Sequence, residues 1–157
     1  MAVRIQERPF DLGTEVALMT AGRTDAGAIV TFSGLCRDRA DSGAALTALT
    51  LEHYPGMTEE ELGRIEAEAR SRWQIADALI VHRVGRILPG EPIVLVVAIS
   101  AHRRAAFEAA SFLMDYLKTS APFWKSEETE EGASWVAAKD SDEAAAGRWR
   151  ESGQEPA

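Results

Sequence analysis

The chain has 157 residues and a mass of 17.1 kDa, with 46% hydrophobic and 27% charged residues, the composition of one globular domain. No apolar run approaches the ~20 residues of a membrane span, and the first residues do not resemble a signal peptide. The net charge of −8 argues against a nucleic-acid binder, and the single cysteine, Cys36, excludes an internal disulfide framework and indicates a reducing, cytoplasmic setting.

The first half of the chain predicts a helix, two strands and a second helix. Apolar residues at helical spacing predict a helix over 10–21, and a buried strand is expected over 28–32. After an exposed polar loop over 37–43, a second strand is expected over 46–51. Thr58 and Glu61 have the spacing of a capping box, which predicts a helix that begins there and ends near Trp73.

The next segment predicts two strands and a long helix. A strand is expected over 76–84, and seven consecutive apolar residues over 93–99 predict a central strand that is covered on both faces. Ser100 is expected to cap a helix over 101–118. Pro122 must lie beyond that helix, in an apolar Pro-Phe-Trp loop.

The C-terminal part is acidic and carries weaker signals. Residues 126–157 have a net charge of −6, whereas residues 1–125 have only −2. A short strand is expected over 134–138, followed by a short helix that packs Trp149 back on the domain, and residues 152–157 are expected to fray. Together the elements predict an α+β fold or a two-layer α/β sandwich.

Two lysines flank the apolar loop, and they are the first candidates for chemistry. Partial desolvation and a neighbouring cation would lower the pKa of Lys118 or Lys125, which makes a usable nucleophile or base near neutral pH. The alternative is that Lys118 neutralises a helix C-terminus and Lys125 is solvated.

A second basic group, formed by His102, Arg103 and Arg104, opens the long helix, where cations are the wrong charge for the helix dipole. Arginine binds two phosphate oxygens at once, so an anion site is one interpretation. The alternative is that the arginines pair with acids such as Glu108. Arg37, after the first strand, is a further basic candidate.

The remaining candidates are weaker. His53, His82 and His102 lack metal-site spacing, so no metal site is expected, and His53 and His82 are interpreted as structural residues. Cys36 lies beside Arg37, which would stabilise a thiolate, but no general base for it is visible.

The chain resembles the family of large, catalytic subunits of molybdopterin synthase over roughly residues 8–150. The strings Leu-Glu-His-Tyr-Pro-Gly-Met and Met-Asp-Tyr-Leu-Lys are long and distinctive. The matching segments are 27–34 with Arg37, 49–59, 82–85, 100–103, 112–118, 121–125 and 135–136.

The resemblance implies a sulfurtransferase of molybdenum cofactor biosynthesis without a cofactor or metal of its own. A small ubiquitin-like carrier would insert its thiocarboxylated Gly-Gly C-terminus, and sulfur would pass to cyclic pyranopterin monophosphate (precursor Z) to form the molybdopterin dithiolene. The expected assembly is a cytoplasmic homodimer within a 2+2 heterotetramer. The expected fold is an α/β hammerhead with an additional α+β subdomain, as one domain over 1–150 with a disordered acidic tail over 151–157.

By position, the resemblance makes Lys118 and Lys125 catalytic and also substrate-binding. It adds Arg37, His102 and Arg103 as substrate-binding residues and places Lys139 where a basic residue is expected near the pocket, whereas Arg104 and Cys36 receive no role.

One helix over 101–118 would separate Arg103 from Lys118 by ~22 Å. We therefore expect each site to be shared between two copies of the chain, the alternative being a helix broken near 109–111. The alternative functions are a non-catalytic module that docks a ubiquitin-like partner, and a phosphate-ester hydrolase, which the lack of metal ligands and of an activated nucleophile disfavours.

Overall fold

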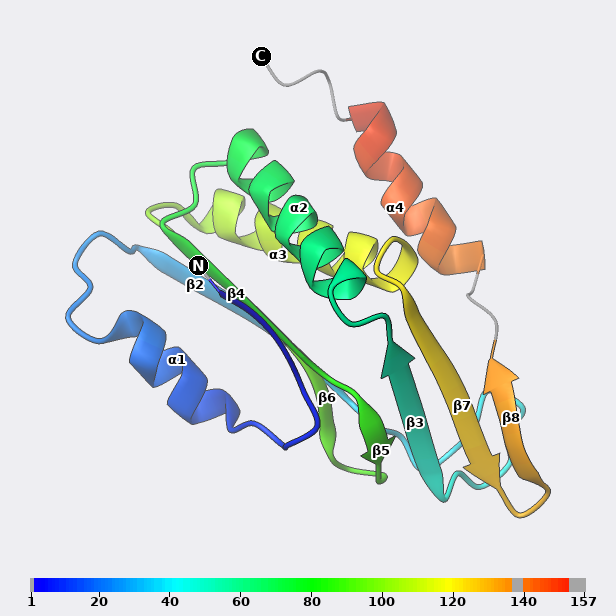
Figure 1. Ribbon diagram of the computed structural model, residues 1–157. Coiled ribbons are helices and arrows are strands. Elements are labelled where there is room, and N and C mark those ends of the chain that lie inside the picture. The colour runs from blue at the N-terminus through cyan, green and yellow to red at the C-terminus, as the bar shows by residue number, and fades with distance from the viewer. Residues whose placement is uncertain (1, 137–139, 153–157) are drawn as a thin grey trace.

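The computed structural model describes residues 2–136 and 140–152, which form eight strands and four helices (Figure 1). In chain order they are β1 (Ala2–Gln6), α1 (Leu12–Thr20), β2 (Ala28–Leu35), β3 (Ala48–His53), α2 (Met57–Arg72), β4 (Asp77–Arg83), β5 (Gly85–Ile87), β6 (Pro92–Ser100), α3 (Arg103–Thr119), β7 (Phe123–Thr129), β8 (Gly132–Val136) and α4 (Asp140–Ser152). None of these helices is long and apolar enough to cross a membrane.

The first sheet has the strand order β1-β4-β6-β2, and β1 and β4 are its parallel pair. Figure 1 shows α2 and α3 on one face of this sheet and α1 on the other. Alternate residues of β6 enter the two cores: Val96 packs on the α2–α3 side, and Val97 on the α1 side. The prediction of a central strand covered on both faces is confirmed.

The second sheet is antiparallel, with the order β5-β3-β7-β8 (Figure 1). One of its faces packs Leu49, Leu51 and Ile87 into a separate small core with Cys36. The α+β prediction is therefore confirmed at the level of two sheets with helices.

Helix α4 packs on α3 through an aromatic cluster. The Trp149 ring lies 5.5 Å from the Trp73 ring and 5.7 Å from the Phe112 ring, between centroids. Its indole Nε1 donates a hydrogen bond to Asp115 at 2.7 Å. The expected packing of Trp149 is present, and α4 runs to Ser152, into the expected tail. Residues 153–157 and Lys139 lie outside the described part of the chain.

The predicted start of α2 is wrong. The helix begins at Met57, because Gly56 turns the chain with φ +87° and its N–H donates to the Glu59 carboxylate at 2.6 Å. The Thr58 hydroxyl lies inside the helix instead, where it accepts from the Tyr54 N–H and donates to the Pro122 carbonyl.

The predicted start of the long helix is also wrong. Ser100 is the last residue of β6, and α3 begins at Arg103 with His102 as its N-cap. The helix then continues unbroken to Thr119, so the alternative of a break near 109–111 is wrong.

Three strands were missed by the sequence analysis. The expected strand over 76–84 ends at Arg83, and at Gly85 (φ +83°) the chain enters the second sheet as β5. The expected Pro-Phe-Trp loop is wrong beyond Pro122, because Phe123–Thr129 forms β7 and pairs with β3. Strand β1 was not predicted at all.

Candidate functional site

A cavity of about 430 Å³ lies at the C-terminal end of α3 and is lined by parts of both sheets. Three of the five predicted site residues, Arg37, Lys118 and Lys125, line it. They come from the loop just after β2, the last turn of α3 and the middle of β7. The structure therefore brings together the two lysines and one arginine that the sequence analysis selected.

Lys125 reaches the cavity because strand residues alternate between the two faces of a sheet. It lies opposite Leu51 in the β3–β7 register, and Glu127, two residues on, lines the same cavity. Glu127 is buried, whereas Trp124, on the opposite face, is exposed. Sequence reasoning missed Glu127, because the alternation is informative only once β7 is recognised as a strand.

Arg37 is held loosely. Its guanidinium donates to Asp41 at 2.9 Å, but its side chain is 68% exposed. An ion pair this exposed contributes ~1 kcal/mol or less, so an anionic ligand can replace Asp41 at little cost.

His82 also lines the cavity, which sequence reasoning missed. Its ring stacks on Phe123 with centroids 3.9 Å apart, and its Nδ1–H donates to the Arg83 carbonyl at 2.8 Å. Burial lowers the pKa of His82 to about 4; the hydrogen bond to the Arg83 carbonyl opposes this shift, and the nearby charge of Lys118 adds to it. The ring is therefore neutral at physiological pH. Ala78 and Ile80 of β4 face α3, and alternation along the strand places His82 on the same face. This alternation is the sequence signal that could have identified His82.

Cys36 lies in the cavity wall with 4% of its surface exposed. Burial raises the pKa of its thiol, and the carboxylates of Glu91 and Glu127 raise it further, which outweighs the opposing charges of Lys125 and Arg37. The thiol is thus protonated at neutral pH, so the structure gives Cys36 no nucleophilic character.

His102 and Arg103 do not line this cavity, since they are exposed at the opposite end of the continuous α3. Arg104 pairs with Glu108 at 3.2 Å, as the alternative interpretation expected. Arg103 has no ion-pair partner among residues 2–136 and 140–152. No side chain caps the first turn of α3, so its free N–H groups and dipole favour an anion there.

The chemistry available in the cavity is the binding and stabilisation of anions. Its cations are the two lysines together with Arg37 and Arg39, and its carboxylates are Glu127 and Asp142. Within the part of the chain that the structure describes, no three His, Cys, Asp or Glu residues are grouped to hold a metal ion.

Comparisons with known proteins agree over nearly the whole chain. The family model described as "MoaE protein" matches residues 5–120. The chain is 58% identical over 154 residues to a molybdopterin synthase catalytic subunit of Mesorhizobium japonicum, covering 97% of this chain and 95% of that protein.

Two solved structures are similar in fold. A molybdopterin biosynthesis MoaE protein from Burkholderia ambifaria superposes with a TM-score of 0.78 at 49% identity, covering 95% of this chain and 98% of that one. A molybdopterin synthase from Staphylococcus aureus also gives a TM-score of 0.78, at 29% identity, covering 85% of this chain and 95% of that one.

Proposed function

Because the chain belongs to the MoaE protein family, we propose that it is the catalytic subunit of a molybdopterin synthase. In this role it is a sulfurtransferase of molybdenum cofactor biosynthesis. It takes sulfur from the thiocarboxylated C-terminus of a small ubiquitin-like carrier subunit and transfers it to precursor Z, forming the dithiolene of molybdopterin.

The observation that carries the proposal is the meeting of Lys118 and Lys125 in one cavity. Both the thiocarboxylate and the phosphate of precursor Z are anions, and a concave site with several cations attracts them although the chain is acidic overall. Lys118, on the last turn of α3, binds or activates the thiocarboxylate and the acyl intermediate. Lys125 and Arg37 stabilise the pterin phosphate and the negative charge that develops during transfer.

The same arrangement supports a site shared between two copies of the chain. The continuous α3 separates Arg103 from Lys118 by ~22 Å along its axis, which is more than a small pterin can span. A two-fold dimer resolves this, because His102 and Arg103 of one copy can then complete the cavity that holds the lysines of the other. The assembly is a homodimer with one carrier subunit on each cavity.

A mixed dimer tests the shared site. Arg103→Ala in one copy and Lys118→Ala in the other place both defects in one pocket and leave the second pocket intact. We expect mixing two inactive variants to restore about half of the wild-type activity per mixed dimer. No restoration, with subunit exchange confirmed by mass spectrometry, would contradict the shared site.

The function itself is tested by reconstitution. Purified protein, thiocarboxylated carrier and precursor Z are mixed, and molybdopterin is measured. Carrier binding without product, under conditions in which a known synthase is active, would favour the alternative of a non-catalytic docking module.

Three finer expectations belong to the same proposal. They are the hammerhead-type arrangement with an additional α+β subdomain, a single domain over 1–150, and a cytoplasmic location. Two distinct sheets support the first, and the packing of Trp149 from α4 on α3 supports the second. The reducing setting indicated by a single cysteine supports the third.

A further inference from the structure

We propose that Gly27 and Ser100 are positioning residues that hold the start of α3, and with it His102 and Arg103, in the orientation needed to enter the pocket of a second copy. The inference rests on the proposed function, since it concerns how the shared site is held. The contacts that support it lie outside the cavity, where the α1–β2 loop meets the end of β6.

The side chains of His102 and Arg103 have no support of their own. Both are exposed, and neither makes a hydrogen bond or an ion pair with any residue the structure describes. Their direction is therefore set by the backbone from Ser100 to Arg103, and a displacement of that backbone moves both side chains together.

Gly27 touches this backbone at a distance that only glycine allows. Its N–H donates to the Ser100 carbonyl at 3.0 Å. A Cβ atom at position 27 would lie 2.2 Å from the Ala101 carbonyl oxygen, far inside van der Waals contact. Because the opposing atom belongs to the backbone, a larger residue at position 27 must displace the segment that carries His102 and Arg103.

Ser100 fixes the same segment from the other side. Its buried hydroxyl donates to the Gln74 carbonyl at 2.7 Å, and its Oγ accepts from the His102 N–H at 3.2 Å. One side chain thus joins the α2–β4 connection to the N-cap of α3. This contact explains why a serine stands at the end of β6 although it does not cap the helix.

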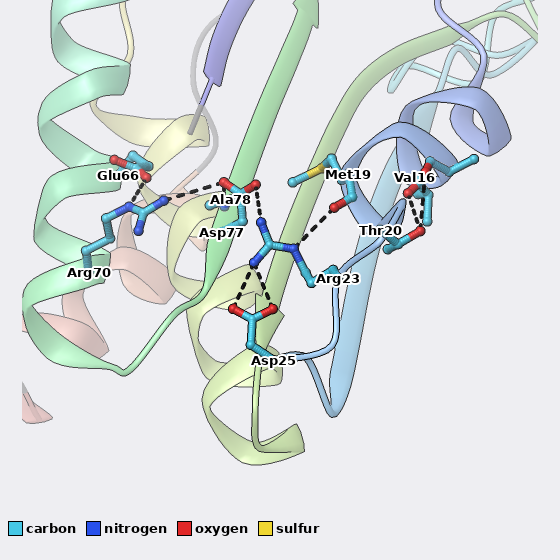
Figure 2. A network of polar contacts seen from close by, with 10 residues as sticks. Val16, Met19, Thr20, Arg23, Asp25, Glu66, Arg70, Asp77 and Ala78 are labelled. Carbon is cyan, nitrogen blue, oxygen red and sulfur yellow. Dashed lines mark hydrogen bonds and ion pairs between the residues drawn. The ribbon is translucent and has the colours of Figure 1, made fainter.

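A chain of ion pairs holds the loop that contains Gly27 (Figure 2). Arg23 binds both oxygens of Asp25 at 3.1–3.2 Å, and its other terminal nitrogen binds Asp77, at the start of β4, at 3.2 Å. Asp77 is in turn 3.6 Å from Arg70, which binds the buried Glu66 at the centre of α2. Loop, strand and helix are linked, so this network restrains the loop that carries Gly27 beside Ala101.

The experiment asks whether a variant damages the part of the pocket formed by His102 and Arg103 or the part formed by the lysines of the other copy. Gly27→Ala and Ser100→Ala are each tested as homodimers and in mixed dimers with Lys118→Ala or Arg103→Ala. Gly63→Ala is the control, because a Cβ atom at that position in α2 would meet nothing within 4 Å beyond its chain neighbours and the backbone of its own helix. Circular dichroism and melting temperature establish that each variant is folded.

We expect the Gly27→Ala homodimer to lose about 10²-fold in kcat/KM for precursor Z, the effect of a misplacement of about 1 Å. The mixed dimer with Lys118→Ala should recover about half of the wild-type activity, whereas the mixed dimer with Arg103→Ala should recover none. A general folding defect would not distinguish between these two partners. Ser100→Ala should sort in the same way with a smaller loss, and it carries the test if Gly27→Ala does not fold.

The possible results distinguish failure of the shared site from failure of the positioning role of Gly27 and Ser100. If Arg103→Ala and Lys118→Ala fail to complement each other, the shared site is wrong and this inference falls with it. If they do complement each other but Gly27→Ala and Ser100→Ala recover with both partners, with neither, or lose no activity, only the positioning role is overturned.

Discussion

The imidazole of His82 and the ring of Phe123 are stacked at a centroid distance of 3.9 Å and an interplanar angle of 18°. His82 belongs to β4 of the first sheet, and Phe123 begins β7 of the second. The contact therefore joins the two sheets beside the cavity, and it anchors the start of the strand that carries Lys125 two residues further on.

His82 makes the stability of the protein depend on pH. Its pKa is about 4 in the folded protein against 6.5 for an ordinary histidine, so between these values the unfolded chain binds more protons than the folded one. The free energy of unfolding should fall as the pH is lowered from 6.5 to 4, by up to ~3 kcal/mol from this residue. Urea denaturation at several pH values measures it.

The matched variant is His82→Phe, which keeps an aromatic ring but cannot be protonated. It should be less stable than wild type at pH 7, because the Arg83 carbonyl loses its hydrogen bond. Its stability should depend less on pH between 6.5 and 4. An unchanged slope would show that His82 does not titrate in this range.

Lys118→Ala should abolish most turnover while leaving the fold intact. The side chain is exposed, so its removal is expected to change stability by ~0.5 kcal/mol or less. Loss of a cation at the reacting anion should lower kcat by about 10²–10³-fold. Single-turnover assays with thiocarboxylated carrier measure the loss, and a near-normal rate would show that the catalytic assignment is wrong.

Lys125→Arg separates charge from proton transfer. The guanidinium preserves the positive charge but does not give up its proton near neutral pH. If Lys125 acts mainly through charge, kcat should stay within about tenfold of wild type, whereas Lys125→Ala should lose about 10²-fold. Equal losses in the two variants would instead point to a general acid or base role.

Trp149→Ala should destabilise the protein by ~3 kcal/mol, because it removes the ring that packs against Trp73 and Phe112 and the hydrogen bond to Asp115. Trp149→Phe keeps an aromatic ring and should cost only ~1 kcal/mol. Truncation after Ser152 is the control and should leave stability and activity unchanged. The midpoints of urea denaturation are measured for the two Trp149 variants and the truncated chain. Equal stability of Trp149→Ala and wild type would contradict a structural role for α4.

Features that depend on local periodicity could be predicted from the amino-acid sequence. Seven apolar residues in a row identified β6 as a strand buried on both faces. Helical spacing without proline or glycine identified α3 as one continuous helix, which already separated Arg103 from Lys118. The distinctive strings around His53 and Lys118 identified the family and selected the two lysines and Arg37.

Which of these residues meet depends on long-range strand pairing, which the sequence pattern does not reveal. The sequence predicts a loop at β7 because its charged residues weaken the local pattern. β7 is a strand because it pairs with β3, where Lys125 lies opposite Leu51, 74 positions earlier in the chain. His82, which the sequence indicates only as a structural histidine, lines the cavity because the pairing of β4 and the packing of Phe123 bring it there. Hydrogen bonds between strands that are far apart in the sequence determine the strand order, and thereby which residues line the cavity. A local sequence pattern carries no information about which distant strand will pair.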